Sequence, residues 1–300
     1  MHCQAKIEEM FPILVMTRNE SNYLSSCIDS ILDTTTIPVY IYIIDNCSDD
    51  PEQLEILSDY DKVSNIKVIR NNNNRWILGL NETLSQVKLR HKSKYFFLTD
   101  GDIDFSQCHA KPCWLTYLVS KMEHNVSIGK IGLSLDWDVL ELHPSLKSIL
   151  SQEKTLYNCN KKIGDLYVSE VDTTASIFRY DWSIEPSGRF YPDHIRYLKP
   201  ELYSCRTRRS VSVLHRGWET YLDESVPSKV SINSKVICFT IVGGDVKKQI
   251  LEQSSTIPRL CYKLFSKPIK KIWTTRRIIF LAIYFFSKGI RRFDGHGAHK

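Results

Sequence analysis

Short apolar runs alternate with amphipathic segments through the first third of the chain. The runs are rich in β-branched and aromatic residues, and they predict strands over 12–16, 39–44, 66–69 and 95–98. Apolar residues at helical spacing predict helices over 23–32, 52–60 and 76–89, the first of them capped by Ser21 or Asn22. Strands that alternate with helices in this way predict an α/β fold with a mostly parallel central sheet and right-handed crossovers.

Polar residues gather directly after each of these four strands, at 17–20, 45–50, 71–74 and 100–104. In an open parallel sheet the carboxyl ends of the strands share one edge, and ligands bind outside that edge. Polar loops are common in any protein, but Asp and Asn recur here just after every apolar run. The pattern therefore predicts a nucleotide-type pocket at the carboxyl edge.

The second half of the chain is less regular. The pattern predicts a helix over 114–122, strands over 130–135, 168–180 and 211–214, a mixture of helix and loop over 136–165, and a loop-rich stretch over 183–198.

The stretch KYFFLTDGDIDF, residues 94–105, carries the most specific chemistry. Asp100, Asp102 and Asp104 crowd the end of a short buried strand, and like charges this close repel each other. Mg²⁺ or Mn²⁺ would offset them, because these cations prefer oxygen ligands. Gly101 allows a tight turn between the carboxylates. The alternative is a solvated acidic turn.

Charge is distributed unevenly along the chain. The net charge is +6, but residues 259–300 carry +10 and residues 1–258 carry −4. A mildly acidic body argues against nucleic-acid binding, and a basic tail favours contact with a polyanionic surface. Within the tail, IIFLAIYFF at 278–286 is too short to span a bilayer, for which about 20 residues are needed. It predicts a helix at the membrane surface, the alternative being a helix packed on the core.

Composition places the chain among globular proteins. Three hundred residues suffice for one large α/β domain or two small ones. Nine cysteines without a CxxC pair indicate reduced, structural thiols in a cytosolic protein. The first residues have no basic segment followed by an apolar one, so we expect no secretory signal.

Several motifs together resemble the GT-A glycosyltransferases, in particular the family 2-like enzymes that build bacterial surface polysaccharides. They are ILVMTRNE, IYIIDNCSDD, NNNNRWILGLN, FFLTDGDIDF, KIGLSLDWDV, VDTTASIFR and HRGWETYLD. The resemblance implies a catalytic domain over 10–225, with a nucleotide-binding half at 10–105 and an acceptor half at 106–225. Residues 226–300 then form an extension with membrane-surface helices. The Glu-Asp motif that the family carries on the acceptor side is missing from this sequence.

The resemblance also implies a donor site. Asp100 and Asp102 would hold Mn²⁺ or Mg²⁺ with His215 as the third ligand, and Asp100 would lie nearer the ribose. The nucleotide base is expected near Thr17, Arg18, Asn19 and Asp45, where a carboxylate can accept the imide hydrogen of uracil. Arg75 is a candidate for a phosphate contact and Asn81 for a contact with base or sugar.

The catalytic base follows from the reaction that the resemblance implies. Transfer with inversion requires a carboxylate that takes the proton of the acceptor hydroxyl. Asp172, on a predicted strand, is the first candidate, and Glu219 and Asp223 are its rivals. The implied enzyme is an inverting, hexosyltransferase-type glycosyltransferase that uses a UDP-sugar. Its acceptor would be a glycan or lipid-linked glycan, and its place the cytoplasmic face of the cell membrane.

Two other functions fit parts of the pattern. A sugar-phosphate nucleotidyltransferase also combines an α/β sheet with metal-binding carboxylates, but it would need a glycine-rich phosphate loop, and TRNESNYL has no glycine. A non-catalytic, membrane-attached scaffold with the same fold would explain the missing Glu-Asp motif.

Overall fold

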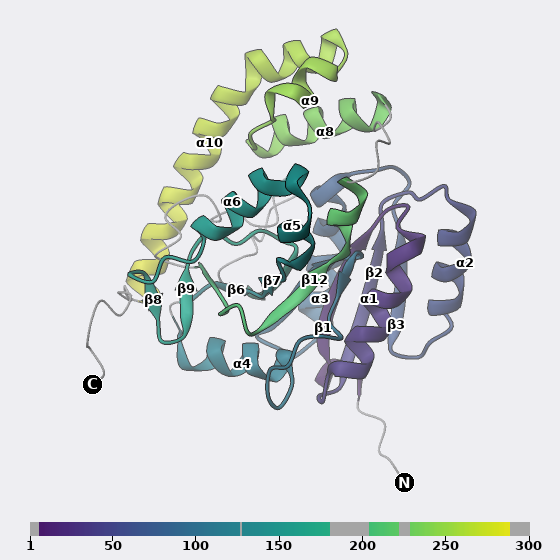
Figure 1. Ribbon diagram of the computed structural model, residues 1–300, viewed down its shortest axis with the longest axis vertical. Coiled ribbons are helices and arrows are strands. Elements are labelled where there is room, and N and C mark those ends of the chain that lie inside the picture. The colour runs from purple at the N-terminus through teal and green to yellow at the C-terminus, as the bar shows by residue number, and fades with distance from the viewer. Residues whose placement is uncertain (1–5, 127, 181–203, 222–228, 289–300) are drawn as a thin grey trace.

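A computed structural model of the chain describes residues 6–126, 128–180, 204–221 and 229–288 (Figure 1). Within these residues, a nine-stranded sheet has the strand order β3-β2-β1-β4-β10-β6-β11-β9-β8, and a three-stranded sheet has the order β5-β12-β7. Helices flank the central sheet, and the C-terminal helices lie together beyond one of its edges (Figure 1). The α/β architecture with a mostly parallel central sheet is as predicted.

The strands of the structure have the following bounds: β1 (Phe11–Thr17), β2 (Val39–Asp45), β3 (Ile66–Arg70), β4 (Tyr95–Asp100), β5 (Ile103–Asp104), β6 (Lys130–Gly132), β7 (Ser134–Leu135), β8 (Lys162–Ile163), β9 (Leu166–Val168), β10 (Ala175–Arg179), β11 (Ser204–Arg206) and β12 (Ser212–His215).

The helices have the following bounds: η1 (Ile7–Glu9), α1 (Ser21–Thr34), α2 (Pro51–Tyr60), η2 (Trp76–Leu80), α3 (Asn81–Arg90), α4 (Trp114–His124), α5 (Asp138–Leu142), η3 (Pro144–Leu146), α6 (Lys147–Thr155), η5 (Arg216–Tyr221), α8 (Lys229–Val242), α9 (Lys248–Gln253) and α10 (Thr256–Lys288).

The N-terminal half of the central sheet is parallel and covered on both faces. Every residue of β1 and β2 is buried, which explains why these strands read as continuous apolar runs. Alternate side chains point to opposite faces. Ile13 packs in one cluster with Ile28 of α1, and Leu14 packs in another with Leu84 of α3. Two hydrophobic layers thus hold the sheet between its helices.

The sheet changes direction at β10, which runs antiparallel to both β4 and β6. Beyond it, β11 is parallel to β6 and antiparallel to β9. In the small sheet, β12 pairs antiparallel with β5 and places His215 opposite Ile103. This pairing carries a residue late in the sequence to the position next to Asp102.

Several local predictions were wrong in detail. Ser21 and Asn22 do not cap α1, because Glu20 is its N-cap residue and makes no side-chain capping bond. The predicted helix over 76–89 is a 3-10 turn followed by α3. The predicted strand over 130–135 is divided into β6 and β7. The loop-rich stretch at 183–198 lies outside the described residues.

The predicted strand over 168–180 is also shorter than expected. The strand β10 begins at Ala175, and Asp172 lies in the loop before it. The Asp172 carboxylate accepts a hydrogen bond from the Thr174 backbone N–H at 3.1 Å. Such a local side-chain bond competes with strand pairing, and β10 begins only after it.

The apolar run at 278–286 belongs to α10, a helix of 33 residues that contains Pro268. This helix packs along α8 and extends past it (Figure 1). Among the described helices, none is both long enough and apolar enough to cross a membrane.

Candidate functional site

The register of the parallel strands brings the predicted polar clusters to one edge of the sheet. Thr17 at the end of β1 pairs with Asp45 of β2, and Asp45 pairs with Arg70 of β3. On the other side of β1, Met16 pairs with Asp100 of β4. Four segments that are distant in sequence therefore end side by side, and the side chains after each strand meet.

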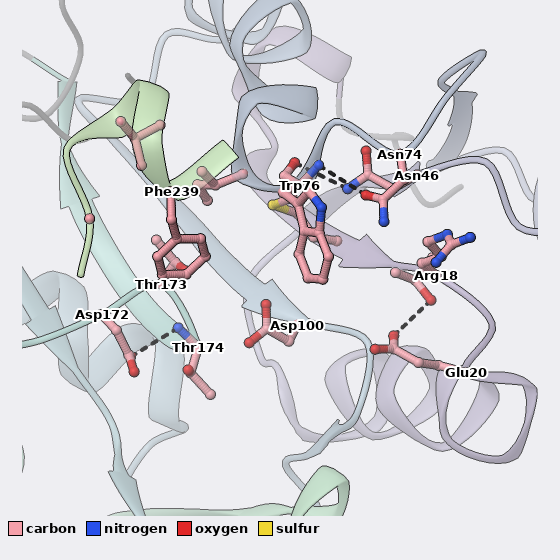
Figure 2. Close-up of a pocket in the computed structure, with 15 residues that line it drawn as sticks. Arg18, Glu20, Asn46, Asn74, Trp76, Asp100, Asp172, Thr173, Thr174 and Phe239 are labelled. Atoms are coloured by element: carbon pink, nitrogen blue, oxygen red, sulfur yellow. Dashed lines mark hydrogen bonds between the residues drawn. The ribbon is translucent and has the colours of Figure 1, made fainter. Parts of the chain in front are cut away.

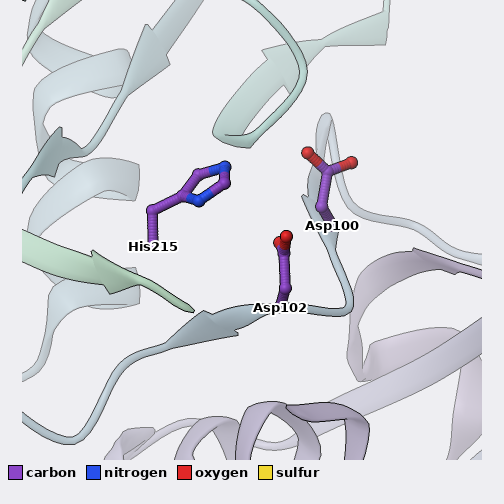
Figure 3. A group of neighbouring side chains, drawn as sticks. All are labelled: Asp100, Asp102 and His215. Atoms are coloured by element: carbon purple, nitrogen blue, oxygen red, sulfur yellow. The ribbon is translucent and has the colours of Figure 1, made fainter. Parts of the chain in front are cut away.

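Three potential metal ligands converge beside this edge. One ligand atom from each of Asp100, Asp102 and His215 lies within 4.8 Å of the others. Figure 3 shows the two carboxylates on the β4–β5 turn and the imidazole approaching from the end of β12. The Arg216 backbone N–H donates to the Asp102 carbonyl at 2.9 Å, which ties the two segments together. The Trp218 ring stacks on the His215 ring with 4.9 Å between centroids and fixes the orientation of the imidazole.

The surroundings of these three residues are suited to a divalent cation. Among the described residues, the buried Asp102 Oδ1 and His215 Nδ1 atoms have no hydrogen-bond partner, and buried polar atoms ordinarily have one. Burial and the Asp102 carboxylate raise the pKa of Asp100 well above its usual range. The same two causes raise the pKa of Glu20 to about 8. Oxygen and imidazole ligands with an excess of negative charge fit Mn²⁺ or Mg²⁺.

A cavity of about 480 Å³ opens next to the three ligands (Figure 2). This volume lies in the range of small-molecule sites. Its walls come from the ends of β1, β2 and β4, the loop before β10, the turn η2 and the end of α8. The lining residues are Met16, Thr17, Arg18, Glu20, Asn46, Asn74, Trp76, Ile77, Asp100, Asp172, Thr173, Thr174, Phe239, Val242 and Gly244.

Four of the residues selected from the sequence line this cavity: Thr17, Arg18, Asp100 and Asp172. Thr17 donates a hydrogen bond to Glu20 at 2.9 Å, and it accepts one from Gln53 at 3.0 Å. Its hydroxyl is therefore held in place at the wall of the cavity.

Asp45 and Asn19 lie beside the cavity and have partners within the protein. Asp45 is completely buried, and its Oδ2 accepts hydrogen bonds from the Ser48 backbone N–H at 3.1 Å and from Arg70 Nε at 3.0 Å. Asn19 adopts a positive φ of 52°, and its side chain donates to Asp49 at 2.6 Å. The neighbouring Asn46, rather than Asp45, reaches the cavity wall.

Arg75 and Asn81 lie on the β3–α3 side. Arg75 lines a second cavity of about 450 Å³, together with Asn71, Asn72, Glu82 and other polar residues. Asn81 is the first residue of α3.

The candidates for the catalytic base lie in different surroundings. Asp172 faces the cavity across from Asp100 (Figure 2). Glu219 lies in η5 and forms an ion pair with Arg216, with 2.7 Å between Oε1 and Nε. Asp223 is outside the described residues.

Some residues of the site could not be selected from the sequence. Trp76 adopts a positive φ of 50° in an asparagine-rich loop, and Phe239 comes from a helix more than a hundred residues after β4. Glu153 and Arg206 form a buried pair, with 4.0 Å between Oε2 and Nη1. Burial is the main cause of the raised pKa of Glu153. The Asp172 charge raises this pKa as well, and the His215 charge lowers it. For Glu20, its place in the polar cluster at 17–20 was the available signal.

The family of the chain follows from its sequence. Residues 13–166 match the model of glycosyl transferase family 2, which covers just over half of the chain. The protein belongs to this family of glycosyltransferases, and its architecture is the GT-A fold that its motifs resemble. This assignment disfavours the sugar-phosphate nucleotidyltransferase. The context of bacterial surface polysaccharides stays a prediction. No curated protein sequence matches the chain.

Solved structures also match the chain, at low sequence identity. The mannosyltransferase PcManGT from Pyrobaculum calidifontis, solved with GDP-Man and Mn²⁺, is 10% identical with a TM-score of 0.46 over 97% of this chain and 79% of that one. S. aureus TarS, residues 1–349, is 12% identical with a TM-score of 0.43 over 84% and 70%. Glucosyl-3-phosphoglycerate synthase from Mycobacterium tuberculosis, solved with Mn²⁺, UDP and phosphoglyceric acid, is 14% identical with a TM-score of 0.42 over 78% and 79%.

Proposed function

We propose that the protein transfers a hexosyl unit, with inversion, from a UDP-sugar to a glycan or lipid-linked acceptor in the synthesis of a bacterial surface glycan. The observation that carries this proposal is the convergence of Asp100, Asp102 and His215 beside a cavity that Asp172 also lines. A cavity of about 480 Å³ has room for a nucleotide-sugar. Membership of the family gives the class of reaction, and the positions of the side chains suggest which residue performs each part of it.

Asp100, Asp102 and His215 would hold Mn²⁺ or Mg²⁺ at the position of the donor diphosphate. A divalent cation there stabilises the negative charge that develops on the departing nucleoside diphosphate. Trp218 orients the imidazole, and the β5–β12 pairing keeps the three ligands together. These contacts would keep the proposed ligands in place before a cation binds.

Asp172 is the proposed general base. The oxygen of the acceptor hydroxyl forms a bond to the anomeric carbon while the bond from that carbon to the diphosphate breaks, and the Asp172 carboxylate takes the hydroxyl proton. Its place on the cavity wall supports this role. Glu219 remains the second candidate, but its carboxylate is already engaged in the ion pair with Arg216.

Thr17 and Arg18 are proposed to contact the nucleoside end of the donor, because both line the cavity at the end of β1. Asp45 and Asn19 would support the nucleoside end of the cavity without lining it, through their hydrogen bonds with the segment after β2. Asn81 keeps its proposed place near the base or sugar. Arg75 would reach a phosphate from the second cavity.

The tail is proposed to bind the cytoplasmic face of the membrane. Seven of the exposed apolar side chains of α10 follow one another at intervals of three, four, seven and eight residues, and they therefore share one face of the helix. They are Ile257, Leu260, Leu264, Ile272, Ile279, Ile283 and Phe286. The helix also carries exposed Lys263, Lys267, Lys270, Lys271 and Arg276, which suit anionic headgroups. This face extends well before the run at 278–286.

We retain the proposed division into a catalytic domain at 10–225 and an extension at 226–300. Within the first, residues 10–105 would bind the nucleotide and residues 106–225 the acceptor. We propose that the extension both binds the membrane and forms part of the cavity, since residues of α8 line the cavity.

A two-stage experiment tests the function. Calorimetry with UDP, GDP and CMP, each with and without Mn²⁺, should give Mn²⁺-dependent binding of UDP. A panel of nucleotide sugars is then screened for hydrolysis, and the sugar released fastest identifies the donor. Absence of nucleotide binding would overturn the proposal and favour the non-catalytic scaffold.

A further inference from the structure

The end of α8 forms one wall of the donor cavity, although α8 lies well beyond the part of the chain that matches the family model. Phe239, Val242 and Gly244 line the cavity, while the match ends at residue 166. This wall therefore lies outside the part of the chain that the family model covers. It closes the side of the cavity that the ends of the strands leave open.

Contacts with η2 hold this wall against the catalytic domain. The Trp76 indole N–H donates to Ser234 Oγ at 3.1 Å, and Cys238 and Val242 pack in one cluster with Trp76 and its neighbours. The Lys235 ammonium lies 5.5 Å from the centroid of the Trp76 ring and 5.9 Å from that of Phe239. One cation thus bridges the two rings.

Contacts with α10 hold the wall from the other side. The Trp273 indole donates to the Ile241 carbonyl at 2.8 Å, and Lys270 pairs with Asp245 at 2.7 Å. Gly243 turns the chain with a φ of +68°, where a β-carbon would lie only 3.1 Å from the Trp273 ring. A Cβ on Gly244 would come within 2.8 Å of the Phe239 ring, so the missing side chain leaves room for that ring.

We propose that Phe239 covers the transferred sugar of the donor and helps to select it, an inference that rests on the proposed function. The diphosphate is assigned to Asp100, Asp102 and His215, and the nucleoside to Thr17 and Arg18. The sugar must then lie toward Asp172, where the acceptor attacks. Phe239 and Asp172 line the same cavity, and in Figure 2 both lie on the opposite side of Asp100 from Arg18.

The chemistry of the ring suits this position. A sugar has an apolar face of C–H groups, and an aromatic side chain buries such a face at a small cost in conformational entropy. Phe239 is half-buried, so part of its surface is available to a ligand. The hydroxyls at the rim of the sugar would face Thr173 and Thr174.

The test compares Phe239→Ala with Ile237→Ala, an exposed apolar residue of the same helix that does not line the cavity. Two constants are measured in full-length protein with Mn²⁺: the KM of the nucleotide sugar that wild type hydrolyses fastest, and the Ki of UDP. Phe239→Ala should raise KM about tenfold, as expected for the loss of an aromatic contact, and change Ki less than about threefold. Ile237→Ala should change neither.

An equal rise in KM and Ki would show that the substitution only loosens the helix, and it would overturn the proposal. Unchanged constants in a folded Phe239→Ala protein would overturn it as well, while leaving the proposed function intact. A wild-type protein that binds no nucleotide would overturn both.

Hydrogen exchange of the wild-type protein gives a second measurement that does not depend on the folding of a variant. The nucleotide sugar should slow exchange of the backbone amides at 236–242 more than UDP does. Equal protection by the two ligands would contradict a contact between α8 and the sugar.

Discussion

Gly217 lies against the Asp102 carboxylate so closely that a β-carbon at this position would collide with Oδ2. The same β-carbon would come within 2.9 Å of Cε1 of His215. The turn η5 can therefore approach two proposed metal ligands only because residue 217 has no side chain.

Gly217→Ala should accordingly weaken metal binding. The added methyl group displaces Asp102 or His215, and disturbance of residues that orient metal ligands costs about 10- to 100-fold in affinity. Calorimetric titration with Mn²⁺ measures the effect. A thermal melt of the metal-free protein serves as the control for folding, and an unaltered Mn²⁺ affinity in the variant would separate Gly217 from the site.

Asp102→Asn should reduce turnover of the nucleotide sugar by about 100-fold or more, because the cation would lose a charged ligand. Stability of the metal-free protein should stay equal or rise, since the Asp102 charge raises the pKa values of Asp100 and Glu20 by repulsion. Asp59→Asn, an exposed carboxylate paired with Lys62, is the matched control and should leave turnover unchanged. Full activity of Asp102→Asn, or activity that survives EDTA, would refute the metal assignment.

Asp172→Asn should lower kcat by about 10²- to 10⁴-fold with a small change in the KM of the donor, as loss of a general base does. The variant keeps an oxygen that can accept the hydrogen bond from the Thr174 N–H, so the loop should persist. Glu219→Gln is the comparison and should retain most activity. Pre-steady-state and steady-state rates of both variants decide between them, and the reverse ranking would make Glu219 the base.

The apolar face of α10 should bind anionic vesicles. Ile279→Asp combined with Ile283→Asp places two charges on a face where both isoleucines are more than half exposed, and binding in a flotation assay should fall about tenfold or more. Leu89→Asp is the control, because it changes an apolar side chain that is 90% exposed on α3. This substitution should not change vesicle binding. Binding of the wild type should weaken with salt and with neutral lipids. Equal flotation of all three proteins would exclude α10 as the anchor.

His91 should make the fold sensitive to mild acid. Burial, with a smaller effect of Arg90, lowers its pKa below the usual value, while the Met10 carbonyl opposes the shift. His91 Nε2 lies 2.8 Å from the Tyr42 hydroxyl and Nδ1 lies 2.9 Å from the Met10 carbonyl, which fits a neutral ring.

Because the unfolded state binds the proton more tightly, the stability that neutral His91 contributes is present above the unfolded pKa of about 6.5 and is lost as pH falls below it. Urea unfolding at pH 7.5 and 5.5 should show a larger loss for wild type than for His91→Gln. Parallel losses in the two proteins would mean that other groups carry the acid sensitivity.

The parallel half of the fold could be predicted because β1, β2 and nearly all of β4 are buried, and because polar residues follow each strand. The same pattern located Thr17, Arg18 and Asp100, since parallel strands end at a common edge. His215 could be selected only with the help of the family resemblance, because its proximity to Asp102 depends on the antiparallel pairing of β12 with β5.

The remaining parts depend on contacts between distant segments. The alternation in VDTTASIF predicts a strand that includes Asp172, whereas β10 begins at Ala175, after the bond from the Thr174 N–H to the Asp172 carboxylate. Phe239 lies in an apolar helix whose local sequence contains no signal for a ligand, and its place at the cavity follows from packing against η2 and α10. Burial of Glu153 beside Arg206 is likewise a tertiary effect, since both look like surface charges in the sequence.

The position of Phe239 late in the chain affects how the protein matures on the ribosome. The sheet and its carboxylates are synthesised first, and the nascent chain acquires the last wall of its cavity only when α8 has emerged and met Trp76. A translation product that stops before residue 239 would lack this wall of the cavity.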